Sequence, residues 1–388
     1  MMAQARRLLL LIVLVMMAGV RYAEADSFHD VSPGDLDGPP GSVIRTENLA
    51  GAPMGATAYR ILYRSRGLDG EPIAVSGMVI IPAGPAPSAG YPIVAWAHPT
   101  SGLISRCAPS LARVRFRQIQ GLELLLRQGY AVTATDYPGL GTPGPHPYLV
   151  GESEGRAVLD SVRAARHVLG SSENRFAAWG HSQGGQAVLY AASLARRYAP
   201  ELDLVGIAAA APATELGRLL RDDLPTSGGK NLLAMTLWSW AQVYHAPIDS
   251  IVDPQAVPVI DNLAQICLES IIDVLPRMED GKQLQKRFLT VDDFTAMAPW
   301  RELIAANTIG VLPSSIAIFL AQGSTDNTVP LAITRDYMKR QCTAGSAIRL
   351  DVLERVGHLS VARDAAPEAV QWIDDRFHHL PATNDCGR

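Results

Sequence analysis

Features that mark several protein classes are missing from this chain of 388 residues. It has no internal repeat, no low-complexity tract beyond its first residues and no apolar run of the roughly 20 residues that span a bilayer. With 48% hydrophobic and 19% charged residues, the composition excludes collagen, coiled coils and disordered chains. It is that of a globular protein long enough to bury a substantial core.

An excess of positive charge is also missing. The formal net charge is −4, and it becomes about −6 if the first 25 residues, with three arginines and one glutamate, are removed. Nucleic acid is therefore not an expected partner.

Cysteine is scarce, and no Cys-x-x-Cys pair or neighbouring His has metal-ligand spacing, so we expect no metal site. The four cysteines are Cys107, Cys267, Cys342 and Cys386. An even number in an exported protein favours disulfides, and spacing alone leaves all three connectivities open.

Export is indicated by the first 25 residues. Arg6 and Arg7 precede an apolar run over 8–20, which ends in the small-residue site Ala23-Glu24-Ala25. This run of about 13 residues is too short for a membrane anchor but typical of a secretory signal. We expect cleavage near Ala25 and a protein that is secreted, either extracellular or in the cell envelope.

The mature chain begins with a Gly/Pro-rich lead over 32–55 and an expected antiparallel hairpin over 57–64 and 72–81. Strand and helix patterns then alternate. Expected strands are 92–97, 130–135, 175–179, 204–211, 316–322 and 348–353. Expected helices are 114–128, 154–169, 183–198, 331–341 and 367–377. Continuous apolar strands alternating with helices predict an α/β fold with a mostly parallel sheet.

The alternation stops between residues 214 and 313, where helical patterns appear around 231–244, 261–274 and 292–306 without a convincing strand. We therefore expect a core in two parts, 26–213 and 314–388, separated by a helical cap or lid over 214–313. Both points where the insertion joins the core are expected near the same edge of the sheet. The cap is expected to form the acyl-binding wall.

The sharpest motif is Gly180-His181-Ser182-Gln183-Gly184, between an expected strand and an expected helix. This is the context of a nucleophile elbow, in which a sharp turn exposes a serine above the sheet. Glycines two residues before and after the serine avoid clashes that a Cβ would cause. Ser182 is the expected nucleophile.

A serine hydroxyl needs a general base, and the base needs a carboxylate to orient it. Asp326 follows the expected strand 316–322, and His358 follows 348–353. Both therefore lie at carboxyl ends of strands, where ligands bind in open α/β sheets. The alternatives are a turn or helix-capping role for Asp326 and a surface loop role for His358. The chain order Ser, Asp, His favours the catalytic interpretation.

Two backbone N–H groups are expected to bind an oxyanion. Gln183 would supply one from the start of its helix. The other should come from the loop 95–102, where Pro99 has no N–H. Thr100 is therefore the expected second donor.

Together these motifs resemble the secretory lipase family of α/β-hydrolases. The resemblance covers nearly the whole mature chain. Beside the exported start and the large helical insertion, it rests on residues 98–102, 107–110, 136–141, 179–184, 323–330 and 357–358. It implies an α/β-hydrolase fold with helices on both faces of the sheet and an inserted cap. It also implies catalytic roles for Ser182, Asp326 and His358, and pairing of Cys107 with Cys267 and of Cys342 with Cys386.

The expected function is hydrolysis of carboxylic esters by a secreted lipase or esterase, similar to triacylglycerol lipases, through an acyl-enzyme and without a cofactor. The expected partners are a small-molecule or lipid ester and, transiently, a lipid interface. Two alternatives stay open. One is a secreted serine peptidase of the prolyl-oligopeptidase type, which uses the same triad. The other is a non-catalytic binding protein that kept the fold.

Overall fold

The computed structural model describes residues 28–222, 224–268 and 271–387, apart from the side chains of residues 271–276 and 278. The chain divides into two units, one ending at Asp30 and one spanning Val31–Arg388, and the second holds the fold described below. The expected signal peptide, residues 1–25, lies outside the described residues. Among the described helices, none is both long and apolar enough to cross a membrane.

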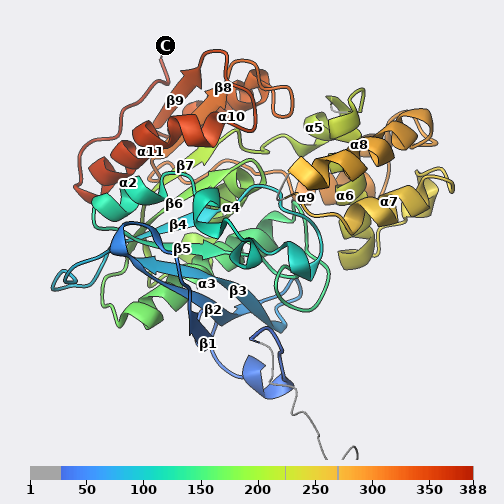
Figure 1. Ribbon diagram of the computed structural model, residues 1–388. Helices are drawn as coiled ribbons and strands as arrows, with labels where there is room; N and C mark the ends of the chain where they lie inside the picture. The colour runs from blue at the N-terminus through green and yellow to red at the C-terminus, as the bar shows by residue number, and fades with distance from the viewer. Residues whose placement is uncertain (1–27, 223, 269–270, 388) are drawn as a thin grey trace, which may run out of the picture. The chain divides into compact units, whose positions relative to one another are not determined.

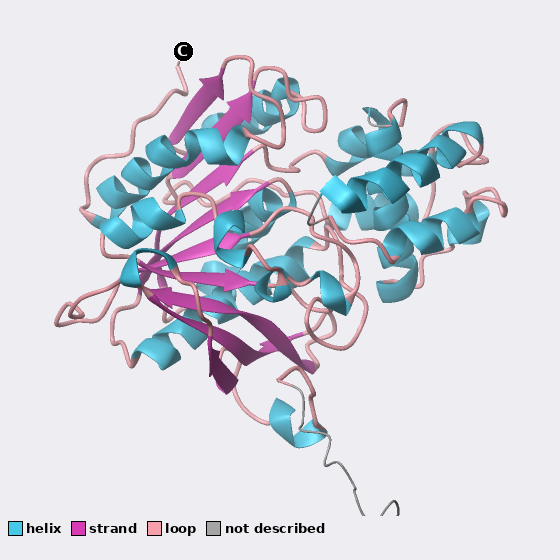
Figure 2. Ribbon diagram, in the orientation of Figure 1, coloured by secondary structure: helices cyan, strands magenta, loops and turns pink. Residues whose placement is uncertain are grey.

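A nine-stranded sheet runs through the second unit in the order β1-β2-β3-β5-β4-β6-β7-β8-β9 (Figure 1, Figure 2). The strands are β1 (Val43–Asn48), β2 (Thr57–Arg66), β3 (Pro72–Ile81), β4 (Ile93–Ala97), β5 (Ala131–Thr135), β6 (Arg175–His181), β7 (Asp203–Ala210), β8 (Ile318–Gly323) and β9 (Ile348–Leu353). Strands β1, β2, β3 and β5 pair antiparallel. From β5 through β9, neighbouring strands are parallel.

Helices cover both faces of this sheet. Those outside the insertion are α2 (Leu122–Arg127), α3 (Gly151–Leu169), α4 (Gln183–Tyr198), α10 (Leu331–Thr343) and α11 (Val361–Phe377). Successive residues of β4 point to opposite faces. Val94 and Trp96 pack with α2 and α11, whereas Ile93 and Ala95 pack with α3, α4 and α10. Every residue of β4 is buried, which explains why the parallel strands read as continuous apolar runs.

Two differences from the expected elements have local causes. Strand β1 forms inside the Gly/Pro-rich lead because it pairs with β2 at the edge of the sheet. The expected helix 114–128 is instead a 3₁₀ turn, Arg115–Gln118, followed by α2. Gly121 separates them with φ +78°, where a Cβ would lie 3.1 Å from Val370 of α11.

The insertion contains α5 (Leu216–Asp222), α6 (Ser227–Val243), α7 (Val257–Ala264), α8 (Ile271–Lys286) and α9 (Trp300–Ala306), which lie beside the sheet at the right of Figure 1. The expected helix 261–274 is broken between α7 and α8. There the Leu268 N–H donates to the Ser101 carbonyl (2.7 Å), and Cys267 bonds to Cys107. These contacts with the core hold the backbone in a non-helical conformation although the local sequence pattern is helical.

The two ends of the insertion join the core at opposite ends of the parallel strands. It leaves at Ala210, the carboxyl end of β7, where the Ala210 carbonyl accepts the Ser182 N–H (2.9 Å). It returns at the amino end of β8. Because β7 and β8 are parallel, this point lies on the side of the sheet where the strands begin, opposite the side where β7 ends. The expectation that both junctions lie near one edge is therefore wrong for the second. The returning chain is held against α4, where Gln186 Nε2 donates to the Asn307 carbonyl (2.7 Å).

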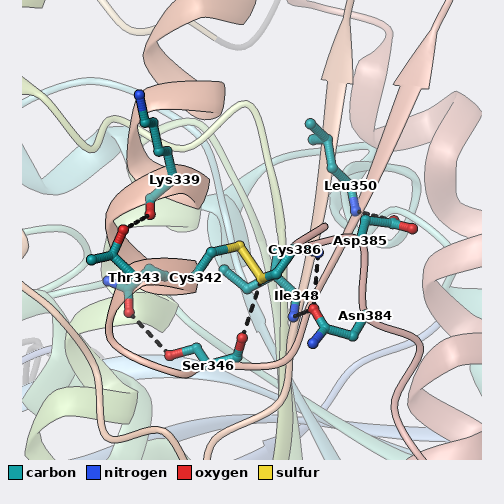
Figure 3. The surroundings of a disulfide bond; sticks show 10 residues. Lys339, Cys342, Thr343, Ser346, Ile348, Leu350, Asn384, Asp385 and Cys386 are labelled. Atoms are coloured by element: carbon teal, nitrogen blue, oxygen red, sulfur yellow. Dashed lines mark hydrogen bonds between the residues drawn. A yellow bond between two sulfur atoms is a disulfide. The ribbon is translucent and has the colours of Figure 1, made fainter. Parts of the chain in front are cut away.

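The two disulfides are paired as the resemblance implied. Cys107–Cys267 joins the loop after β4 to the insertion. Cys342–Cys386 joins the end of α10 to the C-terminal segment (Figure 3). In that segment the Asp385 N–H donates to the Ile348 carbonyl at the start of β9 (2.7 Å). The bridge thus holds the end of the chain to α10, and the hydrogen bond of Asp385 holds it to β9.

Candidate active site

Ser182 occupies the turn between β6 and α4. Its backbone has φ 58° and ψ −116°, a left-handed conformation that costs about 1–3 kcal/mol for a non-glycine residue. Such strain persists only where the surroundings hold it. Here the Ser182 N–H donates to the Ala210 carbonyl (2.9 Å), which ties the turn to β7. The turn therefore has the strained strand-to-helix geometry of a nucleophile elbow.

The two glycines of the motif allow a close approach between the elbow and its neighbours. A Cβ on Gly180 would lie 2.2 Å from the Gly184 carbonyl oxygen, and a Cβ on Gly184 would lie 2.0 Å from that of Ala97. Both obstacles are backbone atoms, which cannot rotate away. Helix α4 therefore begins directly against the end of β4.

Gly184→Ala is expected to destabilise the protein by about 3 kcal/mol or more, because the new methyl group would overlap a backbone carbonyl. Gly228→Ala in α6 is the matched control, since a Cβ there meets no atom within 4 Å. It should change stability by between zero and about +1 kcal/mol, as alanine favours a helix. Urea unfolding of both variants measures the difference, and equal midpoints would contradict this account of the elbow.

His358 links the serine to a carboxylate. Its Nδ1 lies 2.8 Å from Asp326 Oδ2, and its Nε2 lies 2.9 Å from Ser182 Oγ. The carboxylate only accepts, so Nδ1 carries the proton and Nε2 is free to accept the serine hydroxyl proton. The structure therefore brings together three side chains from three separate strand ends.

Asp326 is held as a carboxylate by several donors. Its side chain is fully buried, and its Oδ1 accepts the N–H groups of Thr328 (2.9 Å) and Val329 (2.8 Å). Burial alone would raise the pKa of Asp326. The hydrogen bond and charge of His358, followed by the two backbone N–H groups, hold that pKa below its ordinary value. A charged carboxylate suits the orientation of an imidazole.

His181, the neighbour of the nucleophile in the motif, is a packing residue. Its ring lies 4.9 Å from that of His358, and its Nε2 lies 3.0 Å from the His358 carbonyl oxygen. Burial, followed by the charge of His358, lowers the pKa of His181 to about 3. It therefore stays neutral at ordinary pH and supports the loop that carries His358.

The two expected oxyanion donors lie at neighbouring strand ends, since β4 and β6 are adjacent and parallel. Gln183 begins α4, and Thr100 follows β4, with its Oγ1 3.0 Å from the Tyr148 hydroxyl. Within the part of the chain that the structure describes, neither backbone N–H donates to a protein acceptor. Both remain available to a ligand.

The sequence did not reveal a buried polar cluster behind the elbow. Gln183 Nε2 lies 2.8 Å from both Glu154 Oε1 and His146 Nε2. An acidic residue at the start of an amphipathic helix is ordinarily exposed, and a His between prolines gives no distinctive signal. Only the packing of α3 against α4 buries them. Over the described residues, no group of three His, Cys, Asp or Glu side chains could hold a metal ion.

The sheet, its covering helices and the elbow define an α/β-hydrolase. Two solved structures have similar folds. One is Candida antarctica lipase A in its closed state, with a TM-score of 0.78 and 19% identity over 92% of this chain and 87% of that one. The other is a rice cell wall degrading esterase from Xanthomonas oryzae, with a TM-score of 0.68 and 20% identity over 88% of this chain and 99% of that one.

Residues 117–385 match the family described as secretory lipase, and the chain belongs to that family. It is 27% identical to a secreted triacylglycerol lipase of Malassezia globosa over 92% of this chain and 80% of that protein. It is also 26% identical to a protein of Mycobacterium tuberculosis named "Probable inactive lipase", over 92% of this chain and 83% of that protein. The chain is about equally identical to both relatives, so catalysis has to be inferred from the geometry of the site.

Proposed function

We propose that this protein is a secreted carboxylic-ester hydrolase of lipase or esterase type. The observation that carries the proposal is the continuous relay from Ser182 Oγ to His358 (2.9 Å) and from His358 to Asp326 (2.8 Å). A strained serine aligned with a partly buried histidine and a fully buried carboxylate supports catalysis, because strained backbone persists mainly at functional sites. Cleavage after Ala25 and a mature chain starting at Asp26 are part of the proposal.

The reaction follows from the roles that these atoms can take. Ser182 Oγ attacks the ester carbonyl while His358 Nε2 accepts its proton, and Asp326 stabilises the imidazolium. The N–H groups of Gln183 and Thr100 bind the oxyanion of the tetrahedral intermediate. The intermediate collapses when His358 returns the proton to the leaving alcohol. Water then hydrolyses the acyl-enzyme through the same groups.

The proposal assigns a substrate-covering role to the insertion over 214–313, the cap. Helix α6 of the cap contacts the segment beside Thr100. The Trp240 indole donates to the Tyr148 carbonyl (3.0 Å), and Ser239 Oγ accepts the Tyr148 N–H (2.9 Å). The Tyr148 hydroxyl in turn lies 3.0 Å from Thr100 Oγ1. These contacts place α6 next to the segment that carries Thr100, which supports an acyl-binding role for the cap.

A lipid or small-molecule ester is the proposed substrate class, with transient contact at a lipid interface. Leu359 directly follows His358 and is 92% exposed.

Rates across p-nitrophenyl esters from acetate to palmitate, a triglyceride emulsion and a peptide amide test this function. We expect ester turnover with stoichiometric labelling of Ser182 by a serine-reactive phosphonate, because the relay makes that oxygen nucleophilic. The control is the same labelling after urea unfolding, which should abolish it. Turnover of the amide alone would favour a peptidase, and failure to label the folded protein would favour a non-catalytic binding protein.

A further inference from the structure

The side chain that follows the nucleophile points away from the candidate active site. Gln183 is 1% exposed, and its amide nitrogen lies 2.8 Å from Glu154 Oε1 and 2.8 Å from His146 Nε2. An amide nitrogen carries two hydrogens. Both therefore have an acceptor, and the Gln183 side chain is fixed from two directions.

His146 is suited to accept one of these hydrogens. Its Nδ1 lies 2.9 Å from the Pro138 carbonyl oxygen, which only accepts, so the ring proton lies on Nδ1 and Nε2 presents its lone pair to Gln183. Burial, the largest cause, lowers the pKa of His146 to about 3. The ring therefore stays neutral.

Glu154 supplies the other acceptor. It lies in the first turn of α3 with no exposure, and its Oε1 also accepts the Leu149 N–H (2.9 Å). Among the described residues, its Oε2 has no hydrogen-bond partner. Burial raises the pKa of Glu154 to about 8. The hydrogen bonds from Gln183 and Leu149 act in the opposite direction, but burial without a paired cation has the larger effect, so the acid is mostly neutral at pH 7.

The residues joined by this cluster adjoin strained backbone. Ser182 and Leu149 both have positive φ, 58° and 56°. Ser182 precedes Gln183, and the N–H of Leu149 itself donates to Glu154. Strained backbone relaxes unless several contacts hold it. Helix α4 begins at Gln183, so movement of this residue would turn its N–H away from the carbonyl oxygen of the ester that Ser182 attacks.

We propose that Glu154 is a positioning residue, whose carboxyl and His146 together clamp the Gln183 amide and thereby hold the Gln183 backbone N–H toward the oxyanion. This inference rests on the proposed ester hydrolysis. Glu154 itself does not touch the substrate. It acts through Gln183, and its neutral form keeps negative charge away from the oxyanion.

The buried tyrosines and histidines around Glu154 stay neutral near neutral pH. Burial raises the pKa values of Tyr137, Tyr190 and Tyr244, and the charge of Glu154 adds to each shift. Burial lowers the pKa values of His146 and its neighbour His98 to about 3 and about 4. Glu152, on the same helix, lies toward solvent and pairs with Arg156 (2.6 Å). Glu154 is therefore the group in this cluster that ionises near pH 8.

Glu154→Leu, which removes the acceptor, tests the clamp. We expect kcat per active site to fall about 10- to 100-fold, with KM changed less than about twofold, because the contact acts on the transition state. Asp160→Leu is the matched control. Asp160 is a fully buried carboxyl on the same helix, bonded to Ser65 (2.7 Å) and Tyr198 (2.8 Å). This variant should lose stability but keep its kcat.

Glu154→Gln distinguishes a positioning role of the Glu154 side chain from a role in packing alone. The amide oxygen still accepts from Gln183 and Leu149, so kcat at pH 7 should match the wild type. Wild-type kcat should fall above about pH 8 as Glu154 ionises, because a buried negative charge opposes the oxyanion. Glu154→Gln should lack this alkaline fall.

The pH dependence of the free energy of unfolding tests the ionisation of Glu154 without any measurement of enzymatic activity. The pKa of Glu154 rises from 4.5 in the unfolded chain to about 8 in the folded protein. Its stabilising contribution is therefore complete below about pH 4.5 and lost as pH rises through 8. The urea midpoint of the wild type, relative to that of Glu154→Gln, should decline between pH 5 and pH 9.

Three results would overturn the inference: an unchanged kcat in Glu154→Leu, an equal loss in Asp160→Leu, or identical alkaline profiles for wild type and Glu154→Gln. If Glu154→Leu does not fold, Gln183→Met removes both amide donors, keeps the backbone N–H and should show the same kcat loss. A wild-type protein that neither turns over esters nor labels with phosphonate would overturn the proposed function instead. The pH dependence of stability would then still report whether Glu154 ionises as stated.

Discussion

Ser182→Ala and His358→Ala should each lower ester turnover on the order of 10⁴- to 10⁶-fold while leaving the fold intact, because nucleophile and base act as one unit. The double variant should be scarcely worse than either single variant. Asp326→Asn should retain more activity than Ser182→Ala, since the base is still present but poorly oriented. Steady-state kinetics with p-nitrophenyl esters measures all four losses.

Asp351→Asn is the control for this series. Asp351 lies inside β9, two residues before the strand ends, whereas Asp326 lies 2.8 Å from the His358 ring. Asp351→Asn should therefore keep wild-type turnover, and thermal unfolding should show all variants folded. Wild-type rates in Ser182→Ala, or additive losses in the double variant, would refute the triad mechanism.

Loss of either disulfide should lower the free energy of unfolding by about 2–5 kcal/mol, because each bridge closes a long loop in the unfolded chain. The sequence separations are 160 residues for Cys107–Cys267 and 44 residues for Cys342–Cys386. Double Cys→Ser variants, one for each bridge, would be compared by urea unfolding. Thiol titration of the denatured, non-reduced wild type should find no free thiol.

The two bridges should differ in their effect on the substrate range. Cys107–Cys267 tethers the cap to the loop after β4, and the Leu268 N–H donates to Ser101 in the same loop (2.7 Å). Its removal should reduce turnover of palmitate esters more than that of acetate esters. The Cys342–Cys386 variant is the matched control and should change both rates in the same proportion. Equal proportions in both variants would contradict the acyl-binding role of the cap.

Much of the site could be predicted because its signals are local. The glycines around Ser182 reflect contacts that a Cβ would block, and the buried strands are apolar throughout because both faces are covered. Asp326 and His358 were identified because each lies in the loop that follows a predicted strand. Parallel strands place their carboxyl ends at one edge of a sheet, so the order of elements along the chain predicts which loops meet.

Other features depend on partners far along the chain. Glu154 begins a helix like an ordinary surface acid, and only the packing of α3 on α4 buries it against Gln183. The expected helix 261–274 is broken because contacts with Ser101 and Cys107 hold the chain between α7 and α8. Cysteine spacing allowed three pairings, and only the resemblance chose among them.

By itself, then, the sequence determined the fold class, the nucleophile elbow and the three residues of the relay, because these depend on short motifs and on the alternation of buried strands with helices. The tertiary structure alone decided where the insertion rejoins the sheet and which polar side chains are buried behind Ser182. The physical reason is that burial and long-range hydrogen bonds arise only when segments separated in the chain pack together, and no local pattern encodes their partners.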